Sequence, residues 1–288
     1  MKLDYKNYRI NNAGFFEENG GVRCTLKQCG VEATYPIPEV KFRPKAEILL
    51  MDLDGTTVKS EEFWMYLMQL TVRRVMKDDG FCFREEDIPH IAGFSTYEHL
   101  EYCIKKYKID CSVAVANEIY HEIAKFELNE ILEGRGNAGA FKPREGLKAF
   151  LTGAKERGIK IGLATSGLFY KAVPEIVSAF RTLDMGDPVR FYDAVITGGS
   201  RKRGEYGTVG ELAAKPHPWV YLELANSFGQ YDREKIVVLE DSSAGVLSAR
   251  LAGLPVIGFR DGNLLKSKMD DLCLATVNDF ADVERIIY

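Results

Sequence analysis

The sequence lacks three features that mark whole classes of proteins: an excess of positive charge, long apolar runs and closely paired cysteines. Its 288 residues carry 38 Lys and Arg against 42 Asp and Glu, a formal net charge of -4. Proteins that bind nucleic acid or anionic membranes favour a strongly basic face, so the charge balance gives no electrostatic case for either partner. Chemistry on a small molecule fits this composition better.

No apolar run approaches the roughly 18 residues that a membrane-spanning helix needs. The N-terminal stretch MKLDYKNYRINN also lacks the apolar region of a signal peptide. The six cysteines form no CxxC pair and no Cys/His cluster at zinc spacing, so we expect reduced thiols in a cytoplasmic protein. A Cys24–Cys29 disulfide is the alternative.

From residue 143 onward, short β-branched runs alternate with helical patterns, which is the sequence form of repeated βα units. The expected strands cover residues 48–51, 159–164, 192–197, 235–239, 255–259 and 273–276. The pattern predicts an α/β fold with a doubly wound, Rossmann-like parallel sheet.

Roughly 90 residues separate the first of these strands from the next βα unit, far more than a βα loop contains. The segment has helical periodicity, notably over 96–107 and 113–132. We therefore expect an inserted α-helical cap domain at 59–141 and a core of residues 46–58 and 142–288. Residues 1–45 would form an N-terminal extension, either a small hairpin on the core or a partly ordered segment.

Polar side chains follow several of the expected strands. Asp52 and Asp54 end the first, Thr165 and Ser166 end the second, and Glu240 and Asp241 end a later one, while Lys215 follows a loop. Open α/β sheets build their ligand sites at the carboxyl ends of the strands. The pentapeptide DLDGT alone could equally be a strand that enters a turn, because Asp-Gly is a common turn dipeptide.

The four carboxylates at these ends need a counter-charge. Two unit charges about 4 Å apart repel by roughly 4 kcal/mol at an effective dielectric constant near 20, and Lys215 alone cannot offset that. A set of oxygen ligands with room for water and a phosphate oxygen suits Mg²⁺ better than zinc or copper. The sequence therefore predicts a magnesium site.

A carboxylate beside Mg²⁺ and an ammonium group can attack phosphorus and form an aspartyl-phosphate. We assign that role to Asp52. Asp54 would protonate the leaving oxygen and then take a proton from the attacking water. Thr165, the Ser166 amide and Lys215 would hold the phosphoryl oxygens.

Four motifs together resemble the haloacid dehalogenase (HAD) superfamily of hydrolases, in particular the branch similar to β-phosphoglucomutase and small-sugar phosphatases: DLDGT (52–56), LATSG (163–167), KPHP (215–218) and LEDSSAGVLSARLAG (239–253). The resemblance covers residues 46–288. It implies that Mg²⁺ is held by Asp52, the Asp54 backbone carbonyl, Asp241 and Glu240. It also places Gly93, Phe94 and Ser95 at the family's specificity loop, although a helix–loop–helix turn explains Gly93 equally well.

The resemblance implies a Mg²⁺-dependent phosphomonoesterase that acts on a small phosphorylated metabolite, such as a sugar phosphate. Trp64 stands where mutases of this branch carry a histidine, which disfavours the alternative of a sugar phosphomutase. The alternative from another class is a non-catalytic phospho-ligand-binding protein. We expect a small phosphate ester as the partner, no nucleic acid and no membrane, and take a monomer as the working expectation. A charged loop at 199–211 would contact an anionic substrate or simply be solvated.

Overall fold

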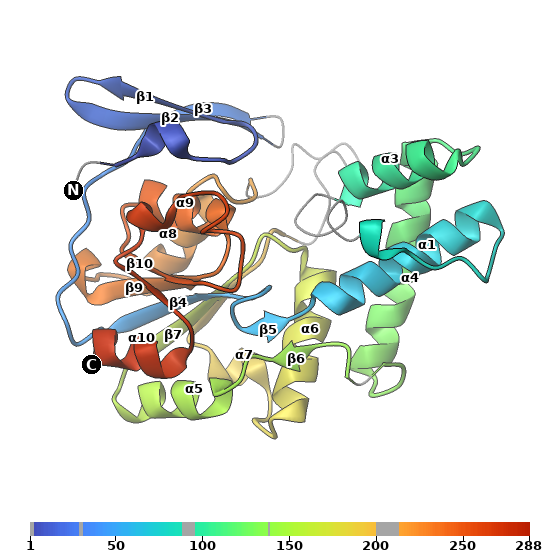
Figure 1. The fold of residues 1–288 in the computed structure, drawn as a ribbon. Coiled ribbons are helices and arrows are strands. Elements are labelled where there is room, and N and C mark those ends of the chain that lie inside the picture. The colour runs from blue at the N-terminus through green and yellow to red at the C-terminus, as the bar shows by residue number, and fades with distance from the viewer. Residues whose placement is uncertain (1–2, 29–30, 88–95, 138, 200–212) are drawn as a thin grey trace.

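The computed structural model describes residues 3–28, 31–87, 96–137, 139–199 and 213–288. A six-stranded sheet lies at its centre, with the order β11-β10-β9-β4-β7-β8 and with all neighbouring strands parallel (Figure 1). The strands are β4 (Ile48–Asp52), β7 (Lys160–Ala164), β8 (Ala194–Ile196), β9 (Ile236–Glu240), β10 (Val256–Phe259) and β11 (Ala275–Val277). The predicted α/β fold class is confirmed.

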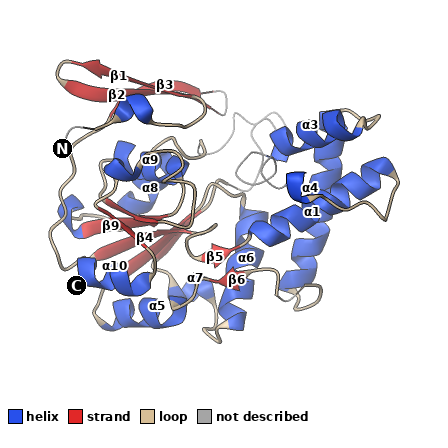
Figure 2. Cartoon of the chain, in the orientation of Figure 1, coloured by secondary structure: helices blue, strands red, loops and turns tan. Residues whose placement is uncertain are grey.

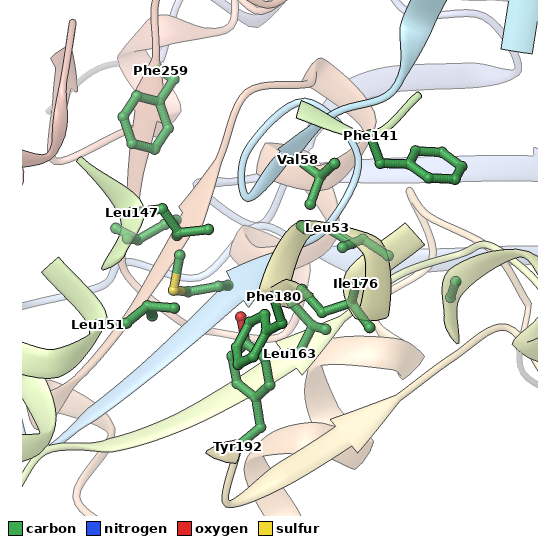
Figure 3. Close-up of a cluster of buried hydrophobic side chains, with 14 of the residues drawn as sticks. Leu53, Val58, Phe141, Leu147, Leu151, Leu163, Ile176, Phe180, Tyr192 and Phe259 are labelled. Atoms are coloured by element: carbon green, nitrogen blue, oxygen red, sulfur yellow. The ribbon is translucent and has the colours of Figure 1, made fainter. Parts of the chain in front are cut away.

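Strand β4 supplies side chains to both faces of the sheet, because successive residues of a strand point in opposite directions. Leu49 and Met51 enter one buried cluster with α5 (Leu147–Glu156), α6 (Phe169–Thr182) and α10 (Phe280–Ile287). Ile48 and Leu50 enter a second cluster with α8 (Trp219–Asn226) and α9 (Ser243–Leu251). Figure 3 shows part of the first cluster between the sheet and helices α5 and α6. Burial on both faces explains why the strand has the continuous apolar sequence ILLM.

A helical unit is inserted between two short antiparallel strands, β5 (Val58–Lys59) and β6 (Lys142–Pro143). Its helices are α1 (Glu61–Met76), α3 (Thr96–Tyr107) and α4 (Val113–Leu132), which lie to one side of the sheet in Figure 2. The boundaries of α3 and α4 agree with the sequence expectation. At the base of the unit, Phe63 and Phe141 contact each other, with ring centroids 4.6 Å apart. Both belong to the buried cluster that contains Leu49 and Met51 of β4.

The N-terminal segment forms an antiparallel sheet of three strands, one more than the expected hairpin: β1 (Ala13–Glu18), β2 (Gly21–Gln28) and β3 (Val31–Pro36). It lies over α8 and α9, away from the inserted helices (Figure 1). Cys24 and Leu26 of the central strand are fully buried in the cluster that contains these two helices. Cys24 is a free thiol.

The N-terminal sheet also contacts the loop that carries Lys215. The hydroxyl of Tyr35 in β3 lies 2.9 Å from Nδ1 of His217, whose side chain is fully buried. We expect Tyr35→Phe to lower the free energy of unfolding by about 1 kcal/mol, the usual net value of one such hydrogen bond. Urea unfolding would measure this, with Tyr97→Phe as the control because Tyr97 is 52% exposed. Equal stability of parent and Tyr35→Phe would show that the contact adds nothing.

The remaining regular elements are short: α7 (Pro188–Phe191) and 3-10 turns at Tyr5–Asn7, Glu85–Asp87, Arg233–Lys235 and Asp270–Leu272. Within the described ranges, no helix combines the length and apolar character needed to cross a membrane.

Candidate active site

Three carboxylates meet at the carboxyl ends of two neighbouring strands. Met51 of β4 pairs with Leu239 of β9, so Asp52 and Glu240, the next residues of the two strands, lie side by side. Asp241 follows directly, and one oxygen of each of these three side chains lies within 4.8 Å of the others. All three residues are buried. The adjacency of β4 and β9 therefore brings together acidic residues that are far apart in the chain.

The cluster holds more negative charge than its surroundings neutralise. Burial, and then the carboxylate of Glu240, raise the pKa of Asp52 well above its ordinary value, although Lys215 opposes this. Burial and Glu240 likewise raise the pKa of Asp241 to about 7. Three crowded carboxylates, of which only Asp52 and Glu240 contact the ammonium group of Lys215, fit a hard divalent cation such as Mg²⁺, because oxygen is the only ligand atom.

Lys215 is the buried cation of the cluster. Its Nζ donates to Asp52 Oδ1 at 2.5 Å, to Glu240 Oε1 at 2.7 Å and to the Tyr221 hydroxyl at 3.2 Å. Burial alone would lower the pKa of Lys215, but Asp52 and Glu240 raise it above its ordinary value. The lysine is therefore charged and fixed beside Asp52.

Glu240 accepts hydrogen bonds on both oxygens. Oε1 accepts from Lys215 and from the Tyr221 hydroxyl at 2.7 Å. Oε2 accepts from the backbone N–H groups of Asp241 and Ser242 and from the Ser242 hydroxyl. Helix α9 passes so close that a Cβ on Gly245 would lie 1.7 Å from Oε1. Glu240 thus orients Lys215, whether or not it also holds a metal.

Asp54 points away from this cluster, toward the inserted helices. Its Oδ1 accepts from the Ser60 hydroxyl at 3.0 Å and from Nε1 of Trp64 at 3.2 Å, and its Oδ2 accepts from the Thr165 hydroxyl at 3.2 Å. Asp54 is exposed, unlike Asp52. Its side chain is not part of the three-carboxylate cluster, so a metal contact from this residue would come from its backbone carbonyl.

The turn after β7 lies between these groups. The Thr165 hydroxyl, besides donating to Asp54, accepts from the Gly167 N–H at 2.9 Å. The Ser166 hydroxyl accepts from the backbone N–H of Lys215 at 2.9 Å, which ties the turn to the lysine loop. The structure thus places five predicted residues, Asp52, Asp54, Thr165, Ser166 and Lys215, at one edge of the sheet. The predicted specificity residues Gly93, Phe94 and Ser95 lie outside the described residues, as does most of the 199–211 loop.

Arg144 is a residue of this region that the sequence analysis missed. It is buried, and it donates to the carbonyl oxygens of Gly55 at 2.6 Å and Thr56 at 2.9 Å. It also forms a two-bond pair with Asp261 and lies 4.0 Å over the ring of Phe259. Gly55 has φ +86°, and a Cβ there would lie 2.2 Å from Asp241 Oδ2. The turn that carries Asp54 is therefore held by an arginine from a distant part of the chain.

Glu175 of α6 is a second such residue. It is 1% exposed, and burial, followed by the charge of Asp54, raises its pKa well above its ordinary value. In the sequence, Glu175 lies inside a helical pattern and is distinguished only by the adjacent Pro174. No local motif could therefore have identified it as a residue of the site.

Comparisons with known proteins show to which family the chain belongs. The haloacid dehalogenase-like hydrolase family matches residues 46–253, starting after the N-terminal sheet. A phosphorylated carbohydrates phosphatase of Thermotoga maritima is 27% identical over 208 residues, which is 72% of this chain and 82% of that protein. CbbY of Rhodobacter sphaeroides, solved with xylulose-1,5-bisphosphate, superposes with TM-score 0.61 at 20% identity, covering 84% of this chain and 100% of its own. A hydrolase of Entamoeba histolytica also superposes with TM-score 0.61, at 17% identity, covering 84% of this chain and 97% of its own. The chain therefore belongs to the haloacid dehalogenase-like hydrolase family.

Proposed function

We propose that this hydrolase is a Mg²⁺-dependent phosphatase that acts on a small phosphorylated carbohydrate through an aspartyl-phosphate. The observation that supports this proposal most is the contact of Asp52 with Lys215 inside a buried carboxylate cluster, with Asp54 turned toward the inserted helices. The name of the Thermotoga relative supports the substrate class. We also propose residues 59–141 as a cap domain, 46–58 and 142–288 as the core, and 1–45 as an extension.

In the proposed first step, an oxygen of Asp52 attacks phosphorus and the bond from phosphorus to the leaving oxygen breaks. Asp54, protonated at this stage, gives its proton to that oxygen. In the second step, Asp54 takes a proton from water, whose oxygen attacks phosphorus, and the bond to Asp52 breaks to release inorganic phosphate. The hydrogen bonds from Ser60, Trp64 and Thr165 would hold Asp54 in place for both transfers.

Residues that bind the phosphoryl oxygens, residues that hold the metal, and the cap would assist these steps. Lys215, Thr165 and the Ser166 amide would hold the phosphoryl oxygens. Mg²⁺ would be held by Asp52, Asp241, the Asp54 carbonyl and Glu240, and when bound it would neutralise charge on those oxygens. Closure of the cap would limit access of bulk water.

The five free cysteines in the described residues also support a reducing, cytoplasmic location.

The test is release of inorganic phosphate from a panel of sugar phosphates, with Mg²⁺ and with EDTA. We expect turnover that falls on the order of 100-fold or more in EDTA, because a bound cation supplies several kcal/mol of charge stabilisation. Formation of an isomeric sugar phosphate as product, without release of inorganic phosphate, would identify the phosphomutase alternative. Binding without turnover of any compound would identify the non-catalytic alternative.

A further inference from the structure

A second cation, Lys171, lies over the ring of Trp64, which contacts Asp54, but is outside the machinery described above. It belongs to the first turn of α6, shortly after the Thr165–Gly167 turn, and is half-buried. Its Nζ lies 5.0 Å from the ring centroid of Trp64 and 4.8 Å from that of Tyr120. It also donates to the Tyr120 hydroxyl at 3.3 Å. Two aromatic residues of the inserted helices thus hold an ammonium group that the core supplies.

The charge of Lys171 has no acidic counterpart in the part of the chain that the structure describes. The neighbouring basic residues Lys142, Lys59 and Arg144 each form an ion pair with a carboxylate, whereas Lys171 forms none. Aromatic faces attract a cation but do not neutralise it. The helix does not explain it either, since a cation is disfavoured in the first turn of a helix. The site retains a positive charge that an anionic group can use.

Trp64 connects this cation to the reaction centre. Its indole Nε1 donates to Asp54 Oδ1, while its ring faces the ammonium group of Lys171. Asp54 is the group that serves the leaving oxygen of the substrate in the proposed mechanism. The indole of Trp64 contacts both Asp54 and Lys171. The part of the substrate beyond the leaving oxygen would therefore lie near Lys171, at the junction of core and cap.

We propose that Lys171, between Trp64 and Tyr120, binds a second anionic group of the substrate. The preferred substrates then carry two anionic groups: the phosphate that is transferred, and a carboxylate or second phosphate at the far end. This inference rests on the proposed phosphatase function and narrows its substrate class.

The test compares fructose 1,6-bisphosphate, 3-phosphoglycerate and fructose 6-phosphate with p-nitrophenyl phosphate, in the parent and in Lys171→Met. We expect the loss of charge to raise KM for the compounds with two anionic groups at least tenfold more than KM for p-nitrophenyl phosphate. Lys171→Arg should restore most of the preference, because arginine keeps the charge and also packs on aromatic rings. A larger rise in KM for fructose 1,6-bisphosphate would identify the second group as a phosphate. A larger rise for 3-phosphoglycerate would identify it as a carboxylate.

The control is Lys125→Met. Lys125 is an exposed lysine of α4 at the same junction, 5.5 Å over the ring of Tyr170, and not in contact with Trp64. It should leave the substrate preference at the parental value. If Lys171→Met raises every KM by the same factor, Lys171 only joins cap to core, and the proposal is overturned.

A binding measurement separates this proposal from the proposed function. Calorimetry on Asp52→Asn should show fructose 1,6-bisphosphate or 3-phosphoglycerate binding at least tenfold tighter than fructose 6-phosphate, and the added Lys171→Met should remove the difference. If this difference in affinity is found but the parent protein turns over none of the compounds, the anion site is supported and the phosphatase function is rejected. Equal binding of all three compounds would reject the anion site.

Discussion

Asp52→Asn is expected to reduce phosphate release on the order of 10⁴-fold or more, because the variant lacks the attacking carboxylate. Asparagine nearly matches the shape of aspartate and can still accept from Lys215 Nζ, which lies 2.5 Å from Asp52 Oδ1 in the parent. The substitution thus removes the attacking oxygen with little change in packing. Phosphate release at saturating sugar phosphate, with Asp110→Asn on the surface as the control, would measure the effect.

The same variant should not lose stability. Burial and the neighbouring carboxylate of Glu240 raise the pKa of Asp52, which means that its negative charge is disfavoured in the folded protein. Without added metal, we expect Asp52→Asn to raise the free energy of unfolding by about 1 kcal/mol, because one of the crowded charges is gone while Lys215 keeps its ion pair with Glu240. For the activity prediction, an Asp52→Asn variant that kept a tenth of the parental rate of phosphate release would exclude Asp52 as the nucleophile.

Arg144→Met is expected to have the largest effect on stability, about 3 kcal/mol. The variant leaves the carbonyl oxygens of Gly55 and Thr56 without their donor, and each hydrogen bond from a charged group contributes about 1.5–3 kcal/mol. The ion pair adds little, because its partner Asp261 is 48% exposed. Guanidinium chloride unfolding would measure the loss.

Activity should fall with stability in Arg144→Met, by about tenfold or more, since the turn that Arg144 holds also carries Asp54 and small displacements at a reaction centre are costly. Arg144→Lys should recover only part of both losses, because a single ammonium group cannot reproduce the planar fork. Arg190→Met is the matched control: Arg190 is 89% exposed, so its loss should change stability by less than about 0.5 kcal/mol. Parental stability in Arg144→Met would contradict the role given to this residue.

The fold could be predicted from the sequence where long patterns carried the information. The expected boundaries of α3 and α4 agree with the structure because each helix has several turns of regular apolar spacing. The α/β class followed from the alternation of strands and helices. The third N-terminal strand was not predicted, because short strands that mix aromatic and polar residues carry a weak signal.

Most of the candidate site could be predicted because it lies at or just after strand ends, and Lys215, which follows a loop, was indicated by the KPHP motif. Asp52 and Glu240 stood out because each ends an apolar run. Arg144 was invisible because its partners lie 88 and 89 residues earlier in the chain, so the contact depends on tertiary structure. In the sequence, Trp64 was notable only for its place at the position of the mutase histidine, but its N–H contacts Asp54, a role that depends on the direction of one side chain.

Strands β5 and β6, which join the proposed cap to the proposed core, would limit how the cap can move. Val58 pairs with Pro143 and Lys59 with Lys142, so the chain enters and leaves the cap through one ladder. A rotation of the cap must therefore bend both connections together, about an axis near that ladder. Any opening of the proposed cap would then be a single rotation, and its angle would set the distance from Lys171 to the rings of Trp64 and Tyr120 in the inserted helices.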